Sequence, residues 1–101
     1  MNWEKIQEKY PKAFSYLKET SHYDVKETRR LYDFFDKNDI FIEISIDKVD
    51  RWFYDIFGCY DSGNIFTIAE NSKYLIRSNA ETAAFEKAFE ILEQKLWQQH
   101  K

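Results

Sequence analysis

The sequence predicts an α+β fold, a two-layer sandwich in which helices cover one face of a four-stranded antiparallel meander. Two observations carry this prediction. Between positions 39 and 77, the larger alternating apolar residues fall on one face if three short turns join four strands. Outside this stretch, three segments carry apolar residues at helical spacing, and each needs a surface against which to bury its stripe.

The predicted element order is α-α-β-β-β-β-α. We expect helices at about 2–19, 24–37 and 79–97, and strands at about 39–47, 51–58, 64–69 and 73–77. No internal repeat or linker divides the chain, and 101 residues suffice for one hydrophobic core. The sequence therefore indicates a single domain spanning residues 1–101.

The central hairpin has the strongest pattern in the chain. Isoleucines at four even positions alternate with Phe41, Glu43 and Ser45, which is the period of a half-buried strand. A three-residue loop at 48–50 would set Asp47 opposite Arg51, and a shift by one residue would mix the two faces. The pairs expected on the apolar face are Ile46 with Trp52, Ile44 with Tyr54, and Ile42 with Ile56.

The same register extends through two more turns. A loop at 61–63 would place Gly63 in the left-handed conformation that such loops need, and Gly58 is also expected to serve a turn. A third loop at 70–72 would lead into the fourth strand. The residues then expected on the helix-covered face are Phe66, Ile68, Tyr74 and Ile76.

The first helical stripe crosses a proline. Trp3, Ile6, Ala13 and Leu17 recur at helical steps, and the stripe stays in phase across Pro11. Two interpretations remain open: one kinked helix, or a short helix followed by a second that has Pro11 at its first position. We favour a break or kink near Tyr10.

The other two helices have clearer ends. The helix at 24–37 should bury Val25, Leu31, Phe34 and Phe35, and Asn38 is a candidate for a left-handed cap. Ser78 followed by Glu81 predicts a capping box at the start of the last helix. In that helix, the side chains expected inside are Ala84, Phe85, Ala88, Phe89, Leu92 and Leu96, and those expected outside are Glu86, Lys87, Glu90 and Glu93.

Composition limits the cellular context. Aromatic residues make up 19% of the chain, charged residues 33%, and the net charge is −3. The single cysteine allows no intramolecular disulfide, and neither a signal peptide nor a membrane-length apolar run is evident, so we expect a cytoplasmic protein with no membrane association. In general type, the chain resembles the small acidic, aromatic-rich accessory proteins of bacteria and phages, which implies no role for any residue.

No motif in the sequence carries chemistry. His22, His100 and Cys59 lack the spacing of a metal site, since zinc requires three or four ligands. Cys59 is better explained as a small residue at a sheet edge than as a nucleophile. No serine nucleophile elbow or glycine-rich phosphate loop is present. We therefore expect no catalytic residue, cofactor or metal, and predict that the protein is not an enzyme.

One predicted surface is not explained by folding alone. The register sends five large apolar residues to the sheet face opposite the helices: Phe41, Phe53, Phe57, Ile65 and Leu75. An uncovered face should be mostly polar, and apolar patches of this kind often mark interfaces. The alternatives are coverage by the N-terminal segment, or a twisted sheet that tucks Phe57 and Ile65 under a loop.

Two carboxylates lie among these residues. Glu43 and Asp55 should face each other across the strands, where like charges are unfavourable. They would serve either as an acid–base or divalent-cation site, or as solvated charges that keep the face soluble. We favour solvated charges, which are the norm on such surfaces.

These features support three hypotheses from different classes. The first is a small interaction module that binds another protein, or a second copy in a homodimer, through the open sheet face. The second is an acidic inhibitor or nucleic-acid mimic that binds a basic partner, because eight acidic residues against three basic ones give a charge of −5 from Asp33 to Asp61. The third is a small enzyme that uses Glu43 and Asp55. Direct binding to nucleic acid is disfavoured by the same negative charge.

Overall fold

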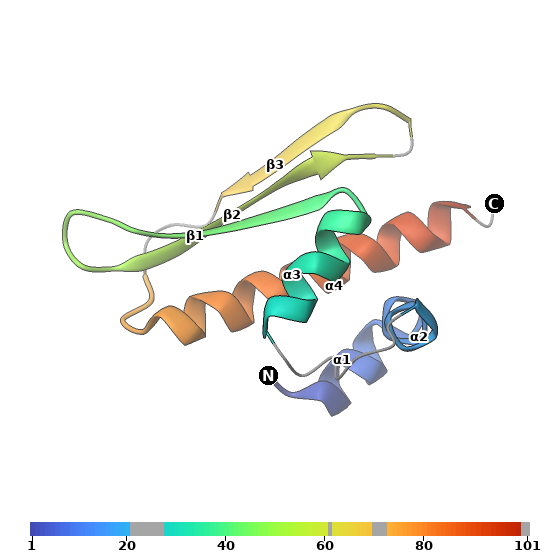
Figure 1. Ribbon diagram of the computed structural model, residues 1–101, viewed down its shortest axis with the longest axis horizontal. Coiled ribbons are helices and arrows are strands. Elements are labelled where there is room, and N and C mark those ends of the chain that lie inside the picture. The colour runs from blue at the N-terminus through green and yellow to red at the C-terminus, as the bar shows by residue number, and fades with distance from the viewer. Residues whose placement is uncertain (21–27, 61, 70–72, 100–101) are drawn as a thin grey trace.

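The computed structural model describes residues 1–20, 28–60, 62–69 and 73–99 and shows an α+β fold. Two short N-terminal helices and a third helix precede a three-stranded antiparallel meander, and a long helix ends the chain (Figure 1). In chain order the elements are α1 (Trp3–Lys9), α2 (Pro11–Thr20), α3 (Thr28–Lys37), β1 (Ile40–Ile46), β2 (Trp52–Cys59), β3 (Ile65–Ala69) and α4 (Arg77–Gln99).

The strand register is the predicted one. Ile46 lies opposite Trp52, Ile44 opposite Tyr54 and Ile42 opposite Ile56. Across the next pair, Ile56 faces Ile68 and Gly58 faces Phe66. The predicted helix-covered face is thereby confirmed for these three strands, except that Ile46 at the end of β1 is 48% exposed. Period-two side chains fix which face each residue takes once the register is set.

The predicted fourth strand is wrong. Instead of turning back along β3, the chain continues along the same edge of β2, where Tyr74 forms a single bridge with Trp52. Asp55 pairs with Ala69, and Trp52 pairs with Tyr74. The two residues of β2 are three positions apart and their partners are five positions apart, so the segment that follows β3 contains two extra residues. The predicted loop at 70–72 lies outside the described residues. Tyr74 still packs against the core, but Ile76 is exposed, contrary to prediction.

The turns show where backbone conformation matters. The Asp47 N–H donates to the Arg51 carbonyl at 2.9 Å, which closes the predicted 48–50 loop, and Asp50 takes a left-handed φ of 59°. Gly63 has the predicted left-handed conformation, with a φ of 91°. Gly58, however, lies inside β2, where an added Cβ would collide with the Asp39 carbonyl oxygen. Close approach of two chain segments, not a turn, requires that glycine.

The helices form two layers on one side of the sheet, so the predicted two-layer arrangement is too simple. α3 and α4 pack against the sheet, while α1 and α2 lie on the side of α4 away from it (Figure 1). Phe89 and Phe35 are fully buried between these elements, and Trp3 of α1 meets the Phe89 ring edge-on at 6.0 Å. Because α4 lies in the middle, it is buried on two sides instead of one.

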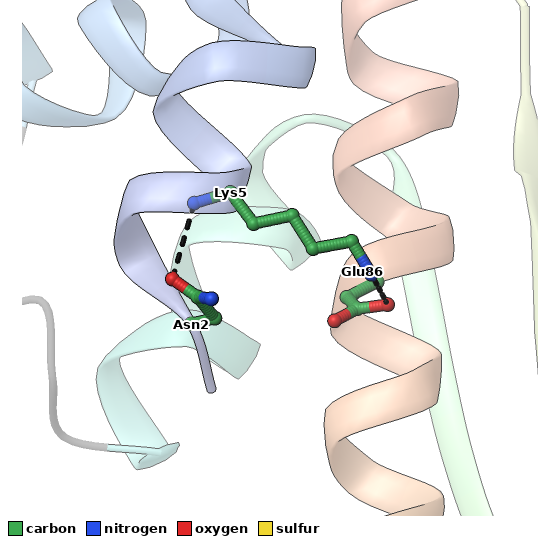
Figure 2. Close-up of polar contacts among 3 residues, drawn as sticks. All are labelled: Asn2, Lys5 and Glu86. Atoms are coloured by element: carbon green, nitrogen blue, oxygen red, sulfur yellow. Dashed lines mark hydrogen bonds and ion pairs between the residues drawn. The ribbon is translucent and has the colours of Figure 1, made fainter.

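The break between the first two helices falls where we favoured it. Tyr10 is non-helical, with φ −129° and ψ 62°, and Pro11 is the first residue of α2. Proline suits this position because its missing N–H would have no helical partner there. In α1, the Asn2 side chain accepts the Lys5 N–H at 3.2 Å, and the Lys5 ammonium lies 3.5 Å from Glu86 of α4 (Figure 2).

Glu93 corrects the predicted outer face of α4. Its side chain is only 7% exposed, and its carboxylate accepts the backbone N–H of Lys12 at 2.7 Å and of Ala13 at 3.1 Å. These N–H groups belong to the first turn of α2 and have no partner within their own helix. A residue 80 positions away thus caps the helix that Pro11 begins.

Lys95 binds the carbonyl end of α3, as Glu93 binds the N–H groups at the start of α2. It is 6% exposed, and its ammonium donates to the carbonyl oxygens of Asn38 at 2.8 Å and of Cys59 at 3.2 Å. Helix C-termini favour cations because their last carbonyls lack partners. The left-handed residue after α3 is Asp39, with φ 60°, and not Asn38 as predicted; the Asn38 side chain donates instead to the Phe34 carbonyl.

The remaining helix predictions hold in part. Leu31, Phe34 and Phe35 of α3 are buried as expected, while Val25 lies outside the described residues. Ser78 is not the N-cap of α4, because the helix already begins at Arg77. The predicted inner residues of α4 are buried, except that Leu96 is only partly so.

Glu81 serves another purpose than the predicted capping box. Its carboxylate accepts the Tyr32 hydroxyl at 3.0 Å and lies 3.7 Å from Arg77. Burial of the phenol, followed by the charge of Glu81, raises the pKa of Tyr32 well above its ordinary value. Tyr32 therefore remains a neutral donor that ties α3 to α4.

Candidate interaction surface on the open sheet face

The sheet has one face without a helix, which we call the open face. Residues at odd positions point to it, since even positions point to α3 and α4. Figure 1 shows all four helices on the same side of the sheet. The open face carries Phe41, Glu43, Ser45, Phe53, Asp55, Phe57, Cys59, Ile65, Thr67 and Ala69.

Aromatic stacking organises the apolar part of this face. Phe41 lies directly opposite Phe57, and their rings stack with centroids 5.6 Å apart and an angle of 28° between the planes. Phe57 remains 38% exposed, whereas Phe41 and Phe53 are half-buried. The stack therefore shields part of Phe41 but leaves ring surface in contact with solvent.

Ile65 extends the patch toward β3, whereas Leu75 lies outside the strands, near the opposite end of β2. Ile65 lies opposite Cys59 at the start of β3 and is 77% exposed. Leu75, which follows the Tyr74 bridge, is 69% exposed. These two are the most exposed of the five predicted interface residues, and neither belongs to the hydrophobic core.

The described residues do not cover the open face. The alternative that the N-terminal segment covers it is excluded, because α1 and α2 pack beneath α4 on the opposite side (Figure 1). The alternative of a loop over Phe57 and Ile65 is inconsistent with the exposure of both side chains. The apolar residues of this face are thus accessible in the monomer.

The two carboxylates take their predicted places. Glu43 lies opposite Asp55, and Ala69 occupies the next position across the sheet. Within the described ranges, no group of three histidine, cysteine, aspartate or glutamate residues is arranged to hold a metal ion. The neighbours of the pair on the open face are Ala69 across the sheet and phenylalanines and Ser45 along the strands, none of them a carboxylate, which gives an incomplete ligand set for a cation.

The other candidate residues lie apart from this pair. Cys59 is an exposed free thiol at the end of β2, and Lys95 bonds its carbonyl oxygen. His22 and His100 lie outside the described residues. No catalytic pairing of the Cys59 thiol with another side chain is found in the described part of the chain.

The structure also shows a surface groove that sequence reasoning missed. A cavity of about 360 Å³ lies between α2 and α4, lined by Pro11, Lys12, Ser15, Tyr16, Glu19 and Leu96. Next to it, the Lys12 ammonium stands 3.6 Å from the centre of the Trp97 ring. The packing of α2 on α4 forms this groove, so no local sequence pattern predicts it.

The acidic residues from Asp33 onward are spread over separate elements. Asp33 and Asp36 lie on exposed positions of α3, Glu43 and Asp55 on the open face, and Asp47 at the β1–β2 turn. Although Asp36 is exposed, some loss of hydration next to the protein surface, followed by the charge of Asp33, raises its pKa. A basic partner would therefore have to reach around the sheet to contact all of them.

Comparison of the chain with protein-family models, curated proteins and solved structures finds no match in any of the three. Function is therefore inferred from the geometry of the open face.

Within the described residues, none of the helices has the combination of length and apolar character needed to cross a membrane. The longest, α4, carries charged side chains along its length.

Proposed function

We propose that the protein is a small non-enzymatic interaction module that binds a protein partner, or a second copy of itself, through the open face. The observation that carries this proposal is the uncovered Phe41–Phe57 stack, which continues toward the exposed Ile65. Contiguous apolar surface of this kind is unfavourable in water and is typical of interfaces. Aromatic residues are also the side chains most enriched among those that dominate binding energy.

The polar residues of the face fit a binding role. Glu43 and Asp55 lie beside the apolar patch, where a partner with basic residues around an apolar centre would neutralise them. An apolar patch with charges beside it would give such an interface specificity for its partner and requires no catalytic residue. Binding at this face also fits a cytoplasmic location for the protein.

The proposal is tested by changing the aromatic surface without changing the core. A Phe41→Ser/Phe53→Ser double variant and a Val49→Ser control are compared with wild type for self-association and for partners captured from extracts of the native host. Val49 suits the control because it is 71% exposed at the β1–β2 turn, away from the patch. We expect the double variant to lose binding while its far-ultraviolet circular dichroism remains nearly unchanged, because both rings lie outside the helix-covered core.

Two results would contradict the proposal. If the double variant fails to fold, the two rings belong to the core. If it folds and retains the partners of wild type, the open face is not the binding surface. A salt series separates the acidic alternative, since binding by the residues from Asp33 to Asp61 should weaken steeply with ionic strength whereas apolar binding should not.

A further inference from the structure

Among the described residues, the sheet has an unpaired edge at β3, and this edge offers backbone groups as well as side chains. β3 is the outermost strand of the sheet order β1-β2-β3 and lies farthest from the helices (Figure 1). The main contacts of α4 are with β1 and β2, and those of α3 are with β1, so the helices pack chiefly on the side of the sheet away from the β3 edge. A free edge presents unpaired N–H and C=O groups to which another strand can be added.

The hydrogen-bond alternation identifies which residues face this edge. The Tyr60 N–H donates to the Asn64 carbonyl at 2.8 Å, and the Trp52 N–H donates to the Tyr74 carbonyl at 2.7 Å. Even-numbered residues of β2 therefore form the hydrogen-bonded pairs with β3. Because hydrogen-bonded pairs alternate along a strand, the backbone groups of Phe66 and Ile68 point toward β2. The N–H and C=O groups of Ile65, Thr67 and Ala69 then point away from β2, toward the unpaired edge of the sheet.

The β3 edge lacks two of the devices that usually prevent strand addition, charged residues and proline. From Ile65 to Ala69 it has no charged residue and no proline. The opposite edge differs, because β1 carries Glu43 in its centre and is flanked by Asp39 and Asp47. Two β1 edges would bring these carboxylates together, whereas the residues from Ile65 to Ala69 of two β3 edges meet without charge repulsion.

We propose that β3 pairs antiparallel with β3 of a second copy, about a two-fold axis at Thr67, to form a six-stranded sheet. In this register Thr67 faces Thr67 of the second copy and Ile65 faces Ala69, so among the open-face residues of β3 the largest side chain meets the smallest. A two-fold interface must be self-complementary in this way. The pairing joins the two open faces into one wider face and does not depend on that face binding any partner.

The edge is short, so the dimer is weak. Five residues on each side give an interface at the small end of the range, and we expect a dissociation constant on the order of 100 µM. Sedimentation of the full chain from about 5 µM to 1 mM should therefore show the mass rise from 12.3 kDa toward twice that value. A monomer throughout this range would overturn the proposal.

Charge substitution at the axis tests the register. Thr67→Lys and Thr67→Glu each place like charges opposite each other, so each should weaken the dimer by at least about fivefold at low salt, and mixing the two variants should restore it. Thr67 is exposed, and folding should survive both changes. Thr20→Lys, which adds the same charge at the exposed end of α2, should leave the dimer unchanged. Failure of the mixture to dimerise would contradict an axis at Thr67.

Amide hydrogen exchange gives a second readout that needs no substitution. Protection at Ile65, Thr67 and Ala69 should rise with protein concentration, while Phe66 and Ile68 should be protected at every concentration. Protection that rises instead at Ile42 and Ile44 would place the contact at β1. A dimer that survives Thr67→Lys but is lost in Phe41→Ser/Phe53→Ser would overturn the edge pairing and leave the open face as the contact.

Discussion

Glu93 and Lys95 are buried charges of opposite sign, and each is matched to the end of a different helix. Glu93 accepts two N–H groups from the start of α2, where the helix dipole is positive. Lys95 donates to the Asn38 carbonyl just beyond α3, where the dipole is negative. Both charges thereby replace the water that burial removes, and together they fix α2 and α3 against α4.

Replacement of Glu93 should be more costly than its single charge suggests. Glu93→Gln removes a charged acceptor from buried N–H groups of Lys12 and Ala13, and we expect the free energy of unfolding to fall by about 1–3 kcal/mol. Urea denaturation followed by circular dichroism measures this change. The matched control is Glu86→Gln, which breaks a partly exposed ion pair with Lys5 and should cost about 0–1 kcal/mol.

An equal cost for the two glutamine variants would contradict the role of Glu93 as a helix cap. Glu86 is a suitable control because both residues lie on α4 and both face the N-terminal helices. Of the two, only Glu93 is buried and bonded to backbone donors.

At the scale of the elements, the hairpin between β1 and β2 was the most predictable part of the chain. Period-two isoleucines and a three-residue loop leave one register that keeps the faces separate, and this register is confirmed. The same alternation predicts that Phe41, Phe53 and Phe57 lie on the open face, and the strand pairing places them there. Local pattern suffices here because both strands are adjacent in sequence.

Elements that depend on distant contacts were less predictable. The segment at 73–77 alternates like a strand, but its partner is Trp52 and not β3, and only one bridge forms. Glu93 has the sequence position of a surface residue, yet packing of α2 against α4 buries it. Neither the choice of partner for a short strand nor burial by a remote helix is encoded in local spacing.

The residues of the open face could be predicted from the sequence, but their exposure to solvent could not. Sequence reasoning could place Ile65 on the open face, but it could not show that Ile65 is highly exposed or that the β3 edge is free. The groove lined by Pro11 and Leu96 left no signal in the sequence, because its walls come from opposite ends of the chain.

The contact between β2 and the chain at Asp39 gives a test at this scale. Gly58→Ala would force a Cβ against the Asp39 carbonyl and the Phe66 ring, so we expect the free energy of unfolding to fall by about 2–4 kcal/mol. Gly63→Ala meets no neighbouring atom and should cost only about 1 kcal/mol, from its left-handed backbone. Thermal or urea denaturation compares the two, and a larger loss for Gly63→Ala would contradict the close approach at Gly58.

At the scale of the whole molecule, the layering explains why one face of the sheet is left open. α4 is buried between the sheet and α1–α2, and α3 completes the cover beside it (Figure 1). All four helices therefore satisfy their apolar stripes on one side of the sheet. Nothing in the described chain covers Phe57 and Ile65, and the proposed binding role of the open face depends on this exposure.

The most direct test is site-specific photo-crosslinking at the exposed ring of the open face. Phe57→p-benzoylphenylalanine places a photoreactive group within the patch, and Val49→p-benzoylphenylalanine is an exposed apolar control at the β1–β2 turn. We predict that irradiation in the native host links position 57, but not position 49, to another protein or to a second copy. Equal crosslinking at the two positions, or no intermolecular product from position 57, would contradict a binding role for the open face.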